Sequence, residues 1–180
     1  MKATYKIDPA HSSANFSIRH LMISNVRGGF SKVDGTVEYD PDDPTSATIE
    51  AAIDASTIRT LDDQRDGHLK SADFLDVEKF PSITFKSKKI TLAGDGEATV
   101  TGDLTIHGVT QPVTLKVEGP TAEGKDPWGN VRIGASATTK IKRSEFGLTF
   151  NAALETGGFM IGDDLKIEID VELVKAAAAA

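Results

Sequence analysis

The feature of this sequence that most constrains its fold is a two-residue alternation of apolar and polar side chains. Such a period places one set of side chains on the buried face of a β-strand and the other set on its exposed face. The first example begins at Ser13, after which Ala14, Phe16, Ile18 and His20 share one face. The same alternation predicts these further inward-facing sets: Val37; Ile49, Ala51 and Ile53; Ile83 and Phe85; Val100, Gly102, Leu104 and Ile106; Val113, Leu115 and Val117; Val131, Ile133, Ala135 and Ala137; Leu165, Ile167, Ile169, Val171 and Leu173. The chain therefore contains many half-buried strands.

Short segments rich in Gly, Pro and Asp separate these strands. Such residues favour turns because they adopt or stabilise backbone conformations that a strand does not use. The predicted turns are residues 40–44, 93–96, 107–112, 123–127 and 157–158. The pairs Gly28-Gly29 and Gly157-Gly158 lack the spacing of a phosphate-binding loop, and we interpret them as barrel corners. Many strands joined by short turns predict a sandwich or a barrel.

One segment, residues 60–71, has helical character. Asp62 suits the first turn of a helix, and Leu61, Arg65 and Leu69 recur at helical spacing. We therefore predict an all-β fold, an antiparallel β-barrel with one short helical insertion.

The length and composition favour one domain that needs no metal or disulfide to fold. A chain of 180 residues with 39% hydrophobic residues can bury a substantial core. We expect residues 1–175 to form this domain and interpret Ala176–Ala180 as a tail or a cloning remnant. Because no apolar signal region precedes Tyr5, we expect a cytoplasmic protein. A periplasmic location would require that a signal segment had been removed.

The charge and the cysteine content exclude several classes of function. The chain has 20 Lys and Arg against 27 Asp and Glu, a net charge of −7, which is the wrong sign for a general binder of nucleic acid or anionic membranes. It has no cysteine, which excludes disulfides, Cys-based zinc sites and thiol catalysis. We expect no nucleic-acid partner and no stable membrane insertion.

The four histidines give no metal-binding pattern. No two of His11, His20, His68 and His107 have a metal-ligand spacing, so we expect no metal ion. His107 is interpreted as a turn residue, and His11 as a residue at the entry to a strand whose ring caps nearby backbone groups. His20 points inward, where an unpaired polar group costs roughly 1–3 kcal/mol. Its expected partner is a buried acid, a backbone carbonyl or the head group of a ligand.

No arrangement of residues predicts catalysis. Asp66 and His68 lie close in sequence, but adjacent helical positions diverge and no G-x-S-x-G motif accompanies them. The scattered acidic residues form no paired-carboxylate motif. We therefore expect no catalytic residue.

Several longer sequence words resemble one known family. They are DPAHSSANFSIRHLMISNVRGGF, RDGHLKSADFLDVEKFPSITFKS, LTIHGVTQPVTL and RSEFGL, and they occur in the order and with the gaps of the YceI-like polyisoprenoid-binding family. The resemblance runs from about Tyr5 to Val174. It implies a lipocalin-like antiparallel barrel of about eight strands, with a helical segment over one end and an elongated apolar pocket for an isoprenoid chain. It also implies a carrier, not a catalyst, and a homodimer.

The inward-facing side chains bear on whether such a barrel is filled. A barrel of about eight strands either fills its interior with side chains or leaves room for one ligand. Here the inward set includes the small residues Ala51, Gly102, Ala135 and Ala137, and aromatic residues are only 6% of the chain. We therefore expect unfilled space.

The functional hypothesis is non-enzymatic transport of a long-chain amphiphilic lipid, a polyisoprenoid such as a polyprenyl phosphate or an isoprenoid quinone. No cofactor is expected apart from this ligand. Two alternatives stay open: an enzyme that hydrolyses or isomerises the lipid, with Asp66 or His68 facing the pocket, and a structural or stress-response β-domain with a filled core. The predicted lipid-binding residues are Phe16, Ile18, His20, Phe30, Val37, Ile49, Ile53, Phe74, Phe85, Leu104, Val117, Ile133, Ala135, Ala137, Ile167 and Ile169. The head-group candidates are His20, Arg59 and Arg65.

Overall fold

A twelve-stranded antiparallel sheet surrounds the interior of the protein in the computed structural model, which describes residues 1–177. Its strands are β1 (Ala3–Ile7), β2 (Ser13–His20), β3 (Ser24–Phe30), β4 (Val33–Tyr39), β5 (Thr48–Asp54), β6 (Ile58–Arg59), β7 (Ser82–Gly94), β8 (Glu97–Ile106), β9 (Val109–Glu118), β10 (Gly124–Lys125), β11 (Val131–Lys142) and β12 (Ile161–Lys175). The helical segments are α1 (Asp63–Lys70), η1 (Pro9–His11), η2 (Pro44–Ser46), η3 (Ala55–Thr57) and η4 (Arg143–Phe146), where η marks a 3-10 helix. The predicted all-β class with a short helical insertion is confirmed.

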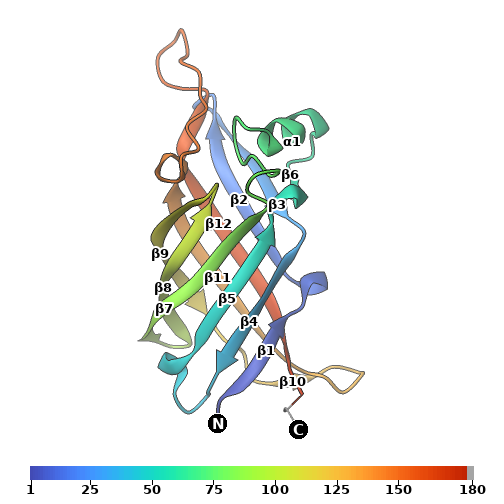
Figure 1. Ribbon diagram of the computed structural model, residues 1–180. Coiled ribbons are helices and arrows are strands. Elements are labelled where there is room, and N and C mark those ends of the chain that lie inside the picture. The colour runs from blue at the N-terminus through green and yellow to red at the C-terminus, as the bar shows by residue number, and fades with distance from the viewer. Residues whose placement is uncertain (178–180) are drawn as a thin grey trace.

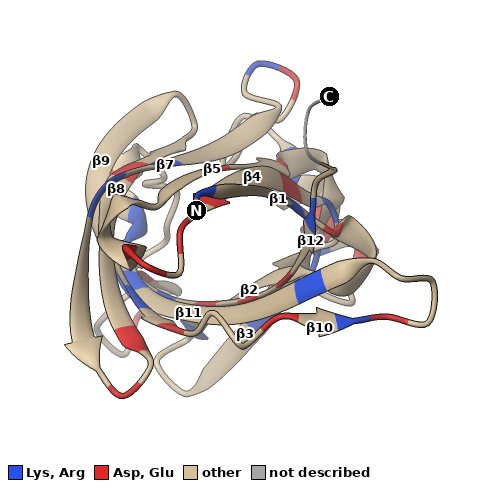
Figure 2. Ribbon diagram, turned by 90° about the horizontal axis from the view of Figure 1, so that it is seen from below, with Lys and Arg blue, Asp and Glu red and all other residues tan. Residues whose placement is uncertain are grey.

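Eight of the strands close into the barrel. Neighbours hydrogen-bond in the order β11-β9-β8-β7-β5-β4-β1-β12, and pairing of β12 with β11 closes the ring. Seen from below, this ring of strands surrounds the barrel axis (Figure 2). The barrel is lipocalin-like, and the prediction of about eight antiparallel strands is confirmed.

The barrel wall forks at β12. Residues 173–175 of β12 pair with β1, whereas residues 161–170 pair with β2, and η1 separates these two neighbours. From this fork β1 leads to β4, while β2 leads to β3 and then to β6. In the described part of the chain no strand ladder joins β6 to β7. We call the end near α1, at the top of Figure 1, the upper end, and the end that holds both termini the lower end.

Aspartates fasten α1 to the preceding segment. Asp62 caps the helix by accepting a hydrogen bond from the backbone nitrogen of Arg65 at 2.8 Å. Asp66 is buried and accepts from the backbone nitrogen and the Oγ1 of Thr60, at 2.8 and 2.6 Å. The Arg65 guanidinium donates to the Oγ1 and the carbonyl oxygen of Thr60, each at 2.7 Å. The predicted helix over 60–71 is confirmed, but it begins at Asp63 because Thr60 and Asp62 form the cap and the tether.

No helix among residues 1–177 has the length and apolar character that crossing a membrane requires.

The structure corrects one turn and one pair of corners. The turn predicted at 107–112 contains only His107 and Gly108, with φ values of 53° and 71°, and β9 starts at Val109. Gly28 and Gly29 lie inside β3 and not at a corner. A Cβ on Gly28 would lie 2.6 Å from the Phe16 ring, so this glycine lets the ring pack directly on the strand. The prediction missed this role because the contact joins two strands.

The buried residues form an upper and a lower cluster. The upper cluster contains Ala55, Ile58, Leu75, Ile83, Ile106, Val113, Ile141, Phe146 and Leu148. The lower cluster contains Tyr5, Ile7, Ala14, Val33, Ile133 and Leu173. The ladder extends slightly beyond β12, because the Ala176 nitrogen donates to the Thr4 carbonyl at 2.8 Å. The rest of the predicted tail, Ala178–Ala180, lies outside the described residues.

Candidate functional site: an apolar cavity along the barrel

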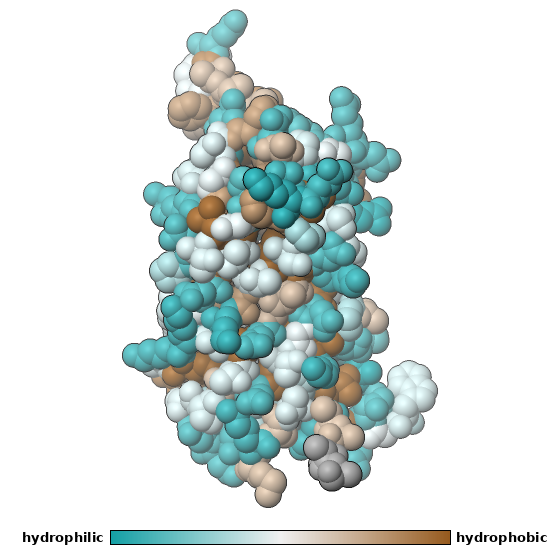
Figure 3. Space-filling view, viewed as in Figure 1, coloured by the Kyte–Doolittle hydropathy of each residue, from teal (hydrophilic) through white to brown (hydrophobic). Residues whose placement is uncertain are grey.

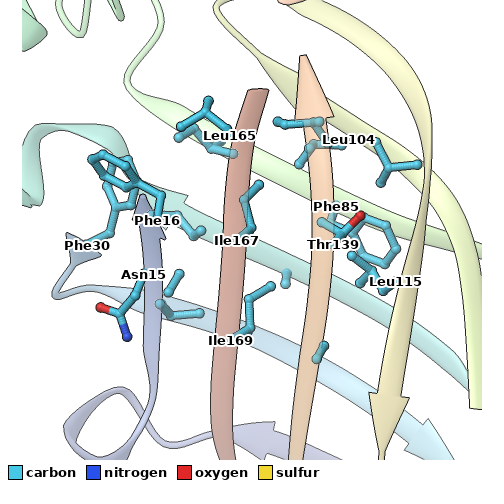
Figure 4. Close-up of a pocket in the computed structure, with 18 of the residues that line it drawn as sticks. Asn15, Phe16, Phe30, Phe85, Leu104, Leu115, Thr139, Leu165, Ile167 and Ile169 are labelled. Carbon is cyan, nitrogen blue, oxygen red and sulfur yellow. The ribbon is translucent and has the colours of Figure 1, made fainter. Parts of the chain in front are cut away.

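An elongated cavity of about 750 Å³ occupies the barrel interior. Figure 4 shows Phe16 and Phe30 on one side of it, Phe85 and Leu104 on the other, and Ile167 between them. The volume falls within the roughly 300–1,000 Å³ typical of sites for small ligands. Because its walls are mainly Ile, Leu, Val, Phe and Ala side chains, the cavity is suited to hydrocarbon.

The cavity follows the long strand β12. Its lining includes β12 residues from Ile161 to Leu173. At about 3.3 Å per residue this stretch is about 40 Å long, and with a strand tilt of about 40° it extends about 30 Å along the barrel. The cavity therefore fits a long, thin ligand better than a compact one.

The structure brings the predicted lipid-binding residues together at this cavity. Its lining contains Phe16, Ile18, His20, Phe30, Val37, Ile49, Ile53, Phe74, Phe85, Leu104, Val117, Ile133, Ala135, Ala137, Ile167 and Ile169. For all of these except Phe74, which lies outside the strands, two-residue alternation carries this information because it fixes which side chains point inward once the barrel closes. Asn15 and Arg19, which alternation places on the outer face, also border the cavity. That the predicted residues contact a lipid stays a prediction.

The small inward-facing residues do not all leave open space. Ala51, Ala135 and Ala137 line the cavity. At Gly102, however, an added Cβ would lie 2.6 Å from the Phe85 ring. The expectation that Gly102 marks empty space is therefore wrong, because Phe85 from the neighbouring strand covers it.

Two of the three head-group candidates line the cavity. His20 and Arg65 lie at its upper end, together with Asp62 and Gln64. Arg59 is exposed and outside the lining, because its neighbour Ile58 takes the inward position on β6. We therefore no longer consider Arg59 a head-group residue.

The partner expected for His20 is not found. Within residues 1–177 its ring makes no hydrogen bond to the protein, and the side chain is only half-buried. The expectation assumed full burial. A half-buried ring can instead satisfy its polar atoms with solvent or with a ligand at the rim.

His68 forms part of the rim and is not paired with Asp66. Its Nε2 lies 2.8 Å from Oδ2 of Asp73, and its ring packs edge-on against Phe74 and Phe150 with centroid distances of 5.0 and 4.9 Å. Asp66 is outside the lining and is bound by Thr60. The acid-imidazole pair at the rim is therefore His68 with Asp73, not His68 with Asp66.

Arg143 is a buried cavity-lining residue that the sequence reasoning missed as a site residue. Its guanidinium donates to four backbone carbonyls: Leu148 at 2.6 Å, Gly162 at 2.7 Å, Phe150 at 2.9 Å and Ile161 at 3.4 Å. Burial lowers the pKa of Arg143, which nonetheless stays charged in this setting. These bonds join both ends of the 148–162 segment. No local pattern could reveal them, because the acceptors come from a loop and a distant strand.

Charged residues gather at the lower part of the wall. Asp8, His11 and Glu172 place their ligand atoms within 4.8 Å of one another, a spacing that could hold a metal ion. Arg132 already supplies positive charge there, with Nη1 2.6 Å from Asp8 and 3.1 Å from Glu172 and Nε 2.8 Å from Asp126. The hydrogen bonds from Arg132 and then His11 lower the pKa of Asp8 to about 2. We interpret this group as structural and propose no metal site.

A family model, a curated protein sequence and two solved structures are similar to this chain. The family model of the YceI-like domain matches residues 5–173. A UPF0312 protein of Staphylococcus aureus is 42% identical over 168 residues, which cover 93% of this chain and 95% of that protein. The crystal structure of a Campylobacter jejuni YCEI protein superposes with a TM-score of 0.73 and 31% identity, covering 88% and 90% of the two chains. A polyisoprenoid binding domain from Saccharophagus degradans shares the fold, with a TM-score of 0.70 and 15% identity over 97% and 99% of the chains.

Proposed function

We propose, from the premise that this chain belongs to the YceI-like family, that it binds and carries a long-chain amphiphilic lipid without changing it chemically. The observation that carries this proposal is the elongated apolar cavity of about 750 Å³ along the barrel. Each methylene moved from water into such a site contributes roughly 0.8 kcal/mol. The hydrocarbon tail therefore supplies most of the affinity, and polar groups at the upper end select the head group.

The lipid class that we propose is a polyisoprenoid, such as a polyprenyl phosphate or an isoprenoid quinone. Two observations support this class: the length of the cavity, about 30 Å along the barrel, and the existence of a polyisoprenoid binding domain with the same fold. His20 and Arg65 are the proposed contacts of the head group. Both lie at the upper end, so the tail would point toward the lower end.

The two alternatives fit the cavity less well. A structural β-domain with a filled core would be close-packed, which a cavity of about 750 Å³ contradicts. A lipid-modifying enzyme would need a general acid or base beside the ligand. Asp66 is bound to Thr60 and lies outside the lining. His68 pairs instead with Asp73, and both of these side chains are solvent-exposed at the rim.

Native mass spectrometry of the freshly purified protein, followed by organic extraction, tests this proposal. We expect an extractable long-chain lipid at up to one molecule per chain. Delipidated protein should then bind a series of isoprenoid alcohols with an affinity that rises with chain length and levels off once the cavity is full. An absence of extractable lipid, together with no uptake by delipidated protein, would overturn the proposal. Loss of substrate in turnover assays with isoprenoid phosphates would favour the enzyme.

A further inference from the structure

The turn between β2 and β3 exposes three consecutive large apolar side chains at the upper end. These residues are Leu21, Met22 and Ile23, and Ile23 is 75% exposed. Leu21 and Met22 have φ values of 51° and 64°, a conformation that is uncommon for residues with large side chains. Exposing such a turn to water is unfavourable, and exposed apolar patches of this kind mark surfaces that contact a partner or a membrane.

The loop that precedes β12 extends this apolar turn. Its Phe159 is 58% exposed, and an added Cβ on Gly158 would lie 3.2 Å from the sulfur of Met22. The Leu21 nitrogen also donates to the Met160 carbonyl at 2.7 Å. Figure 3 shows apolar side chains on this loop at the top of the molecule, above a mostly polar barrel surface. We call Leu21, Met22, Ile23 and Phe159 the apolar tip.

The apolar tip adjoins the cavity. Met160, which the tip residue Leu21 binds, lines the cavity, as does His20 at the end of β2. The tip therefore stands beside the upper mouth of the cavity. Under the proposed function, this is the end at which a tail could enter without crossing water.

Three arginines behind the tip have no carboxylate partner among residues 1–177. In the register of β2, β3 and β6, Arg27 lies opposite Ser17 and Arg59 opposite Gly29, so Arg19, Arg27 and Arg59 form a diagonal row across these strands. Arg19 stands at the edge of the cavity, where its Nη2 donates to the Met22 carbonyl oxygen at 3.3 Å. None of the three arginines has a carboxylate within 4.0 Å in the described residues. Such a row favours phosphate groups, which arginine binds in bidentate fashion.

We infer that the apolar tip and this arginine row dock on the surface of a phospholipid bilayer with anionic head groups. The tip enters the outer edge of the acyl region, and the barrel tilts so that Arg19 and Arg27 reach the phosphates. At about 3.3 Å per residue, Arg19 lies about 7 Å and Arg27 about 13 Å from the turn along their strands. The inference rests on the proposed function. It also revises the expectation that a net charge of −7 excludes binding to anionic membranes, because the net charge of the whole chain does not describe the charge of this one face.

Flotation of the full chain with vesicles tests the inference. One set of vesicles contains phosphatidylcholine alone, and the other contains phosphatidylcholine and phosphatidylglycerol. We expect tighter binding to the anionic set, a loss of about tenfold for Ile23→Ser on both sets, and a loss of about fivefold for Arg27→Gln on the anionic set alone. The matched controls are Trp128→Ser and Lys125→Gln in the exposed loop at the lower end, which should change binding less than twofold.

Loading from detergent micelles separates this inference from the proposed function. If Ile23→Ser loads lipid from micelles like the unchanged protein but loads slowly from vesicles, the docking inference is supported. If the unchanged protein binds anionic vesicles and never loads lipid, the docking surface stands and the carrier function fails. Binding to vesicles that is weak for the unchanged protein, or equal for Ile23→Ser, overturns the inference. A further outcome would also overturn it: Ile23→Ser converts a dimer to a monomer without changing vesicle binding. The tip would then be a contact between two copies of the chain.

Discussion

The two ends of the barrel are built from different interactions. At the lower end, side chains of opposite charge cross-link the wall: Arg132 binds Asp8, Asp126 and Glu172, and Lys175 lies 2.7 Å from Glu123. At the upper end, apolar residues are exposed and the arginines of β2, β3 and β6 have no carboxylate partner among residues 1–177. The difference teaches that ion pairs brace the wall at the lower end, whereas under the proposed function the upper end is the one that exchanges the ligand.

The largest effect is expected from shortening the cavity toward the lower end. Ala135 lines the cavity, so Ala135→Phe places a ring where the end of the tail would lie. Losing room for about four methylenes at about 0.8 kcal/mol each lowers the affinity for the longest chains about a hundredfold, and the plateau shifts to shorter chains. Chain-length titrations measure this, with Thr138→Phe on the exposed face of the same strand as the control. A packed interior would instead lose roughly 1–3 kcal/mol of stability.

The next effect concerns Arg143, the buried charge that joins both ends of the 148–162 segment. Arg143→Met leaves four backbone carbonyls near the cavity without their donor, and we expect a loss of about 2–4 kcal/mol in the free energy of unfolding. Urea denaturation measures this loss. Lys142→Met, at the exposed neighbouring position, should change stability by less than about 0.5 kcal/mol. A loss below about 1 kcal/mol for Arg143→Met would mean that the upper end does not depend on this residue.

The lower end should depend on pH in a defined window. The folded pKa of Asp8, about 2, is below its ordinary value of 3.8, so its stabilising contribution is present above pH 3.8 and is lost as the pH falls toward 2. Carboxyl NMR titration should show the pKa of Asp8 returning toward 3.8 in Arg132→Gln, with a weaker dependence of stability on pH in this window. Lys88→Gln removes the exposed pair with Asp103 and should leave the Asp8 titration unchanged. An Asp8 pKa that is the same in Arg132→Gln and in the unchanged protein would mean that Arg132 does not stabilise the Asp8 carboxylate.

The smallest effect is expected at the aromatic rim. His68→Ala removes its edge-on contacts with Phe74 and Phe150 and loosens the rim. Lipid affinity should fall by less than about tenfold, because the buried tail supplies most of it. Equilibrium binding of a fluorescent isoprenoid measures it. His107→Ala, which loses a similar contact with Phe80 away from the cavity, is the control and should leave binding unchanged. If the protein converts an isoprenoid lipid and His68→Ala abolishes that conversion, His68 is catalytic and the enzyme alternative holds.

The barrel and its interior lining could be predicted because alternation is a local property. Each inward set follows from neighbours in sequence, and β12, with Leu165, Ile167 and Ile169 on one face, shows this most clearly. The same reasoning placed a helix near its observed position from Asp62 and the spacing that follows it. Ladder pairing then brings residues from distant strands to one cavity.

The remaining features depend on contacts between segments that are far apart in sequence. Phe16 packs on Gly28 and Phe85 covers Gly102, which alternation alone cannot reveal. Arg143 reaches carbonyls of residues up to nineteen positions away. The row of Arg19, Arg27 and Arg59 appears only once the register of three strands is known.

The fork at β12 has a consequence for how the wall moves. On the side of β3 that faces away from β2, residues 24–28 have no ladder partner in the described structure, whereas β8 is bonded on both sides. Amides on that edge should therefore exchange hydrogen with solvent long before those of β8. Between β6 and β7 the chain forms α1, which is fastened to Thr60, next to β6, by the bonds of Asp66 and Arg65. This part of the wall can thus widen without breaking a strand ladder, so under the proposed function one barrel accepts tails of different girth.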